Sequence, residues 1–265
     1  MPRGRTIRLL TRRWDGAELH RRPDELIVEE PLEVRLDDHL VATTMRTPGH
    51  DFELAVGLCH GDGLLGGATV LSCRYCGTGS ATDTEFNVVS VDTGGQAPVP
   101  AARLAVTSSS CGLCGSDQIA DLRDRIHPLP TGDPWPVELL ASMPERVLPS
   151  QELFGLTGAV HGAAAFDRSG EVLVVREDIG RHNAVDKVVG HLLLDGRLPA
   201  SELGLYVSGR AGFEIVQKAW AAGFGAVISV SAPSGLAVEA ARAAGLTLVG
   251  FVRGEGPSTA NVYAP

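Results

Sequence analysis

The sequence predicts an α/β protein with a small N-terminal sheet-and-helix domain and a larger C-terminal domain. From about residue 146 onward, short apolar runs alternate with amphipathic segments, as strands joined by helical crossovers do. Before that point strand-like runs dominate, and a proline-rich stretch, "HPLPTGDPWP", separates the two patterns. With 265 residues and 44% hydrophobic composition, the chain is long enough for one large domain or two modest ones.

The N-terminal half contains three expected parts. Residues 1–22 carry seven arginines, and we expect them to form a basic, flexible N-terminus. Residues 23–107 form a small α+β domain: "LIVEEPLEVRL" and "LVATTM" are typical of strands, Thr47-Pro48 opens a helix that ends at "GDG", and further strands are expected over 70–75 and 84–92. Residues 108–145 are interpreted as a cysteine-containing loop, a polar helix near 116–126 and a linker.

Residues 146–265 form the expected C-terminal domain. Strands are predicted at "AVHGAAAF", "EVLVV", "LGLYV", "AVISV" and "LTLVGFV", with helices over 181–195, 211–222 and 235–244. This alternation favours a largely parallel sheet with helices on both faces. The loops "REDIGRH", "SGRAGF" and "SAPSG" leave the carboxyl ends of strands, so we expect them to meet at one edge, where such sheets bind ligands.

Charge and hydropathy narrow the range of functions. The net charge of -9 argues against nucleic acid as a partner, although a local basic patch could still hold an anionic ligand. No apolar stretch of signal-peptide length follows the basic start, and no run approaches the length of a membrane span. We therefore expect a cytoplasmic protein with no membrane partner.

Four of the five cysteines form two CxxC pairs, Cys73 with Cys76 and Cys111 with Cys114. In a reducing compartment such pairs indicate metal or sulfur chemistry rather than a disulfide framework. Three interpretations remain open: a four-cysteine zinc site, a thioredoxin-like dithiol, or an accessible thiolate in "SSSCGLCG" that accepts and passes on sulfur. The fifth cysteine, Cys59, lies in an apolar stretch and is expected to be buried.

Charged residues stand at the start of the predicted helix 181–195. Arg181 and His182 follow Gly180 at its amino end, where free backbone N–H groups favour a phosphate. The alternative is that Glu177, Asp178 and Arg181 make surface ion pairs.

The loop "SGRAGF" and the last predicted strand offer further candidates. Gly209 permits close backbone approach, and Arg210 presents planar donors to a phosphate or a guanine edge. Ser208 precedes them at the strand end. For Phe251, core packing is the alternative to ligand contact.

The motifs "CGLCG", "TGAVHGAAAF", "REDIGRHNAVDKVVG", "SGRAGFEIVQKA", "SAPSGLAVEAA" and "LTLVGFVRG" occur in this order, and the chain resembles the FdhD family over about residues 26 to 263. The resemblance implies a C-terminal domain with a cytidine deaminase-like three-layer α/β/α fold. It also implies a sulfurtransferase that takes persulfide sulfur from a cysteine desulfurase. The sulfur is delivered to molybdenum bound by two molybdopterin guanine dinucleotides, which activates molybdenum-dependent formate dehydrogenase.

This resemblance assigns roles to residues of the sequence. It makes Cys111 the persulfide carrier and Cys114 its helper, with no zinc expected. The guanine dinucleotide cofactor is bound as a substrate, and a homodimer is expected. The expected cofactor-binding residues are His161, Arg181, His182, Ser208, Gly209, Arg210, Phe251, Val252, Arg253, Gly254, Glu255 and Gly256.

Two alternatives from other classes are weighed against this one. A zinc deaminase needs a catalytic Glu two residues after its His ligand and a later PCxxC. Ala163 stands at that position after His161, and no cysteine follows, so that hydrolytic site cannot be assembled. His161 is then either a core histidine or a pocket residue. The second alternative is a zinc- or nucleotide-binding assembly chaperone that transfers no sulfur.

Overall fold

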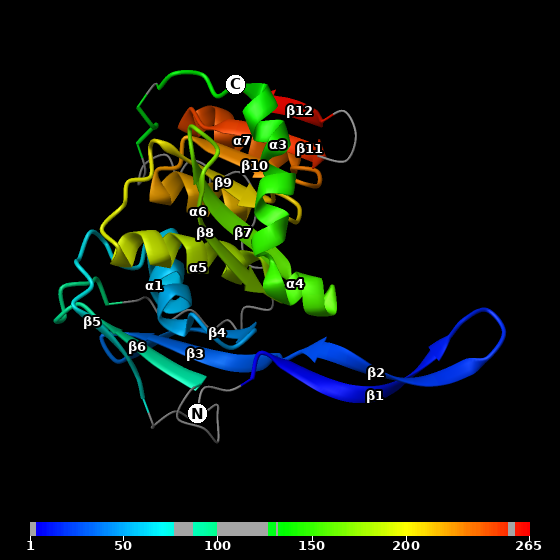
Figure 1. Cartoon of the computed structure of the whole chain (residues 1–265). Coiled ribbons are helices and arrows are strands. Elements are labelled where there is room, and N and C mark those ends of the chain that lie inside the picture. The colour runs from blue at the N-terminus through cyan, green and yellow to red at the C-terminus, as the bar shows by residue number, and fades with distance from the viewer. Residues whose placement is uncertain (1–3, 77–86, 100–126, 131, 254–257) are drawn as a thin grey trace.

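A computed structural model describes residues 4–76, 87–99, 127–130, 132–253 and 258–265 of the chain. Its strands form a two-stranded hairpin, a four-stranded sheet and a six-stranded sheet, which follow one another in this order along the chain. Helices lie between the strands in the sequence. The two larger sheets form the body, and the hairpin projects from it as an arm (Figure 1). The mixed α/β class expected from the sequence is confirmed.

The arm consists of β1 (Thr6–Trp14) and β2 (Leu19–Ile27), paired antiparallel along their whole length. The turn at its tip is closed by the Asp15 carboxylate, which accepts the N–H groups of Ala17 and Glu18 at 2.9 Å. Where we expected a flexible N-terminus over 1–22, the described residues are therefore regular strands. The apolar residues of the arm show no simple alternation, so the sequence pattern gave no strand signal.

The four-stranded sheet carries the N-terminal unit and has the order β4-β3-β6-β5. Helix α1 (Asp51–Gly61) packs on it, with Leu54, Ala55 and Leu58 facing a core that includes Leu32 and Val89. The strands are β3 (Glu30–Leu36), β4 (His39–Arg46), β5 (Ser72–Tyr75) and β6 (Val88–Asp92). The helix and strands expected in this region are thus present, with shorter bounds for the last two strands.

The six-stranded sheet has the order β12-β11-β10-β9-β7-β8. Strands β9, β10 and β11 are parallel, whereas β7 pairs antiparallel with both β8 and β9, and β12 is antiparallel to β11. The sheet is therefore mixed rather than largely parallel. The bounds are β7 (His161–Asp167), β8 (Val172–Asp178), β9 (Leu203–Val207), β10 (Ala226–Ser229), β11 (Thr247–Arg253) and β12 (Thr259–Ala264).

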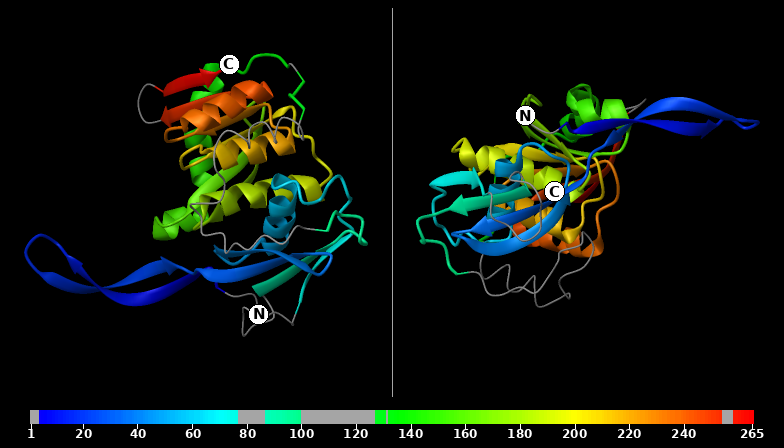
Figure 2. Two further views of the ribbon diagram at one scale, coloured as in Figure 1. Left: turned by 180° about the vertical axis from the view of Figure 1, so that it is seen from behind. Right: turned by 90° about the horizontal axis from the view of Figure 1, so that it is seen from below.

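Helices cover both faces of this sheet, as expected. One face packs against α5 (Arg181–Leu194), α6 (Phe213–Ala222) and α7 (Gly235–Ala244) around an alanine- and valine-rich core. The other face packs against α3 (Val137–Val147), which is followed by a 3₁₀ turn and by α4 (Glu152–Thr157). Figure 2 shows α3 on one side of the sheet and the three other helices on the opposite side.

Helix α3 occupies most of the last part of the segment 108–145, which we expected to end in a linker. Leu140, Met143 and Val147 recur at helical spacing and are fully buried against the sheet, next to Phe166. The adjacent prolines and the internal Pro144 masked this stripe in the sequence. Strand β12 was also missed, because half of its side chains are exposed and its apolar run is short. No helix in the described part of the chain is long and apolar enough to span a membrane.

The two units are joined through the crossing of α1 and α5, the most extensive helix–helix contact among the described residues. A Cβ on Gly57 would lie 1.9 Å from the Asp186 carbonyl oxygen, and one on Gly190 would lie 1.8 Å from that of Glu53. The helix backbones therefore touch, which no larger residue at either position permits. This crossing fixes the N-terminal unit beside the start of α5.

Candidate functional site

The loops singled out from the sequence lie at one edge of the six-stranded sheet. Strands β9, β10 and β11 are parallel to one another. Strand β8 runs in the same direction as β9, because both are antiparallel to β7. Their carboxyl ends therefore meet at one edge, as expected. The loops there are 179–180, 208–212 and 230–234, and the amino end of α5 opens directly from the first of them. We call these loops, with His161, Arg181 and Phe251, the cationic edge.

His161 and the loop after β9 are in direct contact. The Ser208 hydroxyl accepts the Gly162 N–H at 2.9 Å and lies 3.4 Å from Nδ1 of His161. Gly209 is buried beside them, and a Cβ there would be 3.2 Å from the His161 ring and 3.6 Å from Cδ of Arg181. His161 is thus a half-buried residue of the edge rather than a histidine of the interior.

The charge balance of this edge is positive. Burial lowers the pKa of His161, and the nearby Arg181, His182 and Arg210 lower it further. At neutral pH its imidazole is therefore neutral, while the arginines are charged. Among the described residues, buried Nε of Arg181 has no hydrogen-bond partner. His182 pairs with Glu214 at 2.9 Å and lowers the pKa of that carboxyl. Such an arrangement suits an anionic group at the amino end of α5.

Phe251 continues the edge with an unusual backbone. Its φ of 53° lies in the left-handed region, which a bulky residue rarely adopts, and the β11–β12 register shifts here. The Phe251 N–H donates to the Ser231 carbonyl oxygen at 3.1 Å, and the nearby Ser229 hydroxyl donates to the Gly209 carbonyl oxygen at 2.7 Å. Phe251 is 39% exposed, so core packing does not explain its position. Strain of this kind is concentrated at functional sites.

The remaining expected residues of this strand have different positions. Val252 is buried in the core beneath α3, and Arg253 is exposed. Gly254, Glu255 and Gly256 lie outside the described residues. Ser229 and Glu214 were missed by the sequence analysis, which included Ser231 only as part of the loop "SAPSG", because polar side chains at strand ends and helix starts carry no distinctive pattern.

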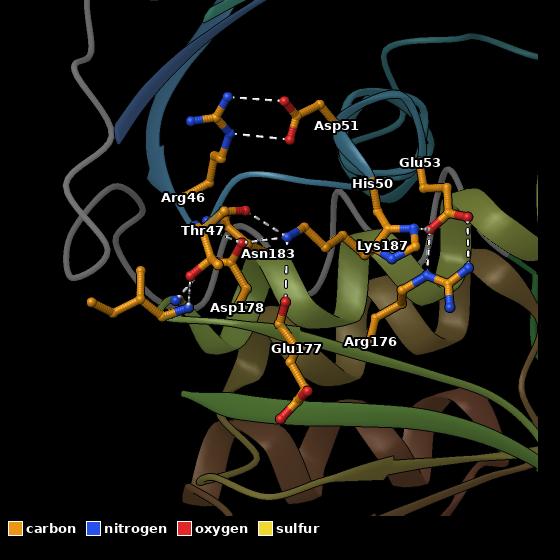
Figure 3. A network of polar contacts seen from close by, with 12 residues as sticks. Arg46, Thr47, His50, Asp51, Glu53, Arg176, Glu177, Asp178, Asn183 and Lys187 are labelled. Atoms are coloured by element: carbon orange, nitrogen blue, oxygen red, sulfur yellow. Dashed lines mark hydrogen bonds and ion pairs between the residues drawn. The ribbon is translucent and has the colours of Figure 1, made fainter. Parts of the chain in front are cut away.

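The motif "EDIGRHNAVDK" also builds a second cluster, which faces inward and which we call the joint (Figure 3). Asp178 is fully buried and pairs with the equally buried Lys187 at 2.8 Å. The Asp178 carboxylate also accepts the Thr47 N–H at 3.1 Å and the Asn183 amide at 3.0 Å. Lys187 donates to the Thr47 carbonyl oxygen at 2.9 Å. These bonds connect residues from the two units.

The surface ion pairs considered for Glu177 and Asp178 are therefore wrong, because both side chains are buried. The Glu177 carboxylate accepts the N–H groups of Leu153 and Phe154 at 2.8 Å and so caps the start of α4. The available signal was Lys187, a lysine placed among valines of a helix stripe, which indicates a buried charge with a partner.

Two further ion pairs flank the joint. Buried Arg46 and Asp51 form a bidentate pair at 3.1 and 2.9 Å. Arg176 donates two hydrogen bonds to the Glu53 carboxylate, at 2.5 and 2.7 Å. Glu53 comes from α1 and Arg176 from β8, so this pair also connects the two units (Figure 3). Burial disfavours the ionised Glu53 carboxyl, but Arg176 and His50 outweigh it and hold its pKa at about 2.

Some of the five cysteines lie inside the described residues and others lie outside them. Cys111 and Cys114 lie outside the described residues. Cys73 lies in β5, and the backbone ladder continues through Cys76, whose N–H donates to the Val88 carbonyl oxygen at 2.9 Å. Residues three apart in an extended chain point to opposite faces, and Cys73 packs against the N-terminal core. This pair does not form the turn of a zinc knuckle.

Burial raises the pKa of the Cys73 thiol to about 11, which makes it a poor nucleophile. Cys59 is fully buried, as expected, and burial raises its pKa as well. Among the described residues no group of three or more His, Cys, Asp or Glu side chains is placed to hold a metal. The sulfur chemistry expected of this chain therefore depends on the second pair.

The fold and the cationic edge define an α/β protein whose six-stranded sheet presents an edge suited to anions next to a buried polar joint between its two units. The sequence profile of the FdhD/NarQ family matches residues 27–265, and the chain belongs to this family.

Several relatives carry the name sulfur carrier protein FdhD. The protein from Streptomyces avermitilis is 48% identical over 260 residues, covering 94% of this chain and 90% of the relative. The protein from Nocardia farcinica is 47% identical over 249 residues, covering 92% and 88%. A solved structure from Desulfotalea psychrophila, described as a formate dehydrogenase accessory protein, aligns with a TM-score of 0.75 over 99% of this chain and 98% of its own. At 24% identity this structure supports the fold alone.

Proposed function

We propose that this protein is a sulfur carrier that serves the maturation of a molybdenum-dependent formate dehydrogenase. It accepts persulfide sulfur from a cysteine desulfurase on Cys111. It delivers the sulfur to molybdenum held by two molybdopterin guanine dinucleotides. Membership of the family, whose relatives are named sulfur carrier proteins, supports the carrier role.

The observation that carries the cofactor part is the positive charge of the cationic edge. Arg181 and Arg210 surround a neutral histidine at a helix amino end, and Nε of Arg181 is buried without a partner among the described residues. A molybdopterin guanine dinucleotide is long and heavily anionic, so its phosphates match these donors. Phe251 presents a partly exposed ring at the same edge, where it can contact a guanine face.

The transfer chemistry requires an accessible thiolate. The Cys111 thiolate attacks the outer sulfur of the desulfurase persulfide, the sulfur–sulfur bond breaks, and the desulfurase cysteine leaves as a thiolate. The Cys114 thiolate then attacks the inner sulfur of the Cys111 persulfide. A disulfide forms between the two cysteines, hydrosulfide passes to the molybdenum, and a cellular thiol reductant restores the pair.

Intact mass spectrometry after incubation with cysteine and a cysteine desulfurase tests this proposal. The wild type should gain one sulfur atom, roughly 32 Da. Cys111→Ala should abolish the gain, whereas Cys114→Ala should keep at least part of it, because loading needs only the first thiol. Loading of the Cys111 variant but not the Cys114 variant would reverse the two roles.

Elemental analysis separates the carrier from a zinc-binding chaperone. We expect less than one zinc per chain after purification. One tightly held zinc per chain that is lost in Cys111→Ser would replace the carrier by a structural metal site.

A further inference from the structure

Ser229 ends strand β10 and is fully buried at the inner side of the cationic edge. Its hydroxyl oxygen lies 2.7 Å from the Gly209 carbonyl oxygen and 2.9 Å from the Ser231 carbonyl oxygen, so its single proton is shared between two acceptors. The Ser231 N–H donates back to the hydroxyl at 3.3 Å. The side chain therefore bonds both to the loop after β9 and to the loop after β10.

The bond from Ser229 to Gly209 is not part of a local turn. A serine at a strand end often closes a turn with the residues that follow it, and the contacts of Ser229 with Ser231 have this form. The Gly209 carbonyl, however, belongs to the loop of another strand, 20 positions earlier in the chain. This bond fixes loop 208–212 relative to loop 230–234, which are two of the three loops of the cationic edge.

The two bonded carbonyl groups set the direction of the N–H group that follows each of them. In a trans peptide the C=O and the next N–H point in opposite directions. Because the Gly209 carbonyl points inward to Ser229, the Arg210 N–H points outward. The Ser231 carbonyl turns the Ala232 N–H outward in the same way. Within the described part of the chain neither of these N–H groups has a hydrogen-bond partner, and solvent reaches both residues.

The backbone of Phe251 depends on the same serine. The Ser231 carbonyl oxygen accepts the Ser229 hydroxyl at 2.9 Å and the Phe251 N–H at 3.1 Å. A Cβ on Gly250 would lie 3.1 Å from this oxygen, so the neighbouring strand leaves it little room to move. The left-handed backbone of Phe251 is thus held by an oxygen atom that Ser229 holds in turn.

We propose that Ser229 is a positioning residue of the cationic edge. Backbone N–H groups that are oriented toward one place form an anion-binding concavity. Ser229 orients the N–H groups of Arg210 and Ala232, and these bind a phosphate of the guanine nucleotide beside the Arg210 guanidinium. It also fixes the distance between that phosphate and the ring of Phe251. This role rests on the proposed function, because it needs a guanine nucleotide at this edge.

Calorimetric titration of Ser229 variants with guanosine diphosphate tests this role. Ser229→Ala removes one oxygen atom from a fully buried position, so no larger side chain has to be accommodated. The two carbonyl groups lose their common donor, and the affinity should fall about 10-fold. Ser229→Thr keeps the hydroxyl and should bind within about threefold of the wild type. Ser90→Ala removes a buried hydroxyl from β6 in the other unit and should bind like the wild type.

The amide signals of Arg210 and Ala232 in nuclear magnetic resonance spectra give a readout that a purely structural role would not move. In the wild type and in Ser90→Ala, both amide protons should shift downfield as guanosine diphosphate is added, because each gains a charge-assisted hydrogen bond. In Ser229→Ala these two shifts should be lost even at saturating nucleotide. The remaining amide signals of that variant should stay dispersed as in the wild type, which shows that it is folded.

The possible results distinguish this role from the proposed function. A wild type that does not bind guanosine diphosphate overturns the nucleotide site and, with it, the role of Ser229. If the wild type binds, equal affinity in Ser229→Ala overturns the positioning role alone, and so do Arg210 and Ala232 signals that fail to move in the wild type. Equal losses of affinity in Ser229→Ala and Ser229→Thr, or in Ser229→Ala and Ser90→Ala, would assign the effect to packing rather than to the hydroxyl and would also overturn it.

Discussion

The joint and the cationic edge are built from one stretch of sequence but differ in how their charges are compensated. In the joint, Asp178 and Lys187 are fully buried, and each has partners from both units. Three residues after Asp178, Arg181 stands at the edge with an Nε that has no hydrogen-bond partner in the described part of the chain, and a second arginine lies nearby. The difference teaches that a family motif can mix structural and ligand-binding residues. The number of hydrogen-bond and ion-pair partners of each side chain distinguishes the structural residues from the ligand-binding ones, whereas sequence similarity to the family does not.

The largest effect should come from breaking the joint. Lys187→Met leaves the Asp178 carboxylate buried without its counter-charge, and such losses cost about 3–5 kcal/mol of stability. The midpoint of urea unfolding should fall accordingly. Arg197→Met, which removes one exposed positive charge, should leave the midpoint unchanged. A Lys187 variant as stable as this control would show that the joint does not stabilise the fold.

An edge variant should show the opposite pattern. Arg210 is exposed, so Arg210→Ala should keep the unfolding midpoint while losing one charge-assisted contact to a phosphate or guanine. We expect calorimetric affinity for guanosine diphosphate to fall roughly 10- to 100-fold. Arg197→Ala is the matched control. Equal affinity in the Arg210 variant and the wild type would place nucleotide binding elsewhere.

Acid should weaken the contact between the two units through Glu53, whose ion pair with Arg176 flanks the joint. The pKa of Glu53 is lowered from 4.5 to about 2 in the folded protein, so its stabilising contribution is complete above about 4.5 and is lost as the pH falls towards 2. Unfolding free energies measured across this window should decline more steeply for the wild type than for Glu53→Gln. Parallel declines would mean that other carboxylates account for acid sensitivity.

The smallest effect concerns Phe251. Because its φ is positive, Phe251→Gly should be more stable than Phe251→Ala by about 1 kcal/mol, since only glycine adopts this backbone without strain. Both variants should bind guanosine diphosphate more weakly, because both lose the exposed ring. Thermal unfolding compares the two stabilities. Equal stabilities would show that the backbone relaxes once the ring is removed.

Much of the fold could be predicted because its strands and helices carry periodic apolar patterns. The strands β7 to β11 and the helices between them are found close to the expected residues, and so is the meeting of their loops at one edge. Helix α3 and the arm were not found, because prolines hid the first and mixed faces hid the second.

The split between joint and edge could not be predicted, for a different reason. Thr47 and Asp178 are 131 residues apart, and no local pattern announces that they bond. Nor does a sequence show that Phe251 has a positive φ or that Glu177 caps a helix. Partners distant in the chain decide these points, and they become visible only once the units are packed together.

The backbone contact between Gly57 and Gly190 has a consequence for how the molecule unfolds. With no side chain between them, α1 and α5 cannot separate gradually, and any parting exposes the cores of both sheets together. The N-terminal unit is small and would be weak alone. Attached in this way it melts with its larger neighbour in a single cooperative transition, so a substitution in either sheet lowers the melting temperature of both.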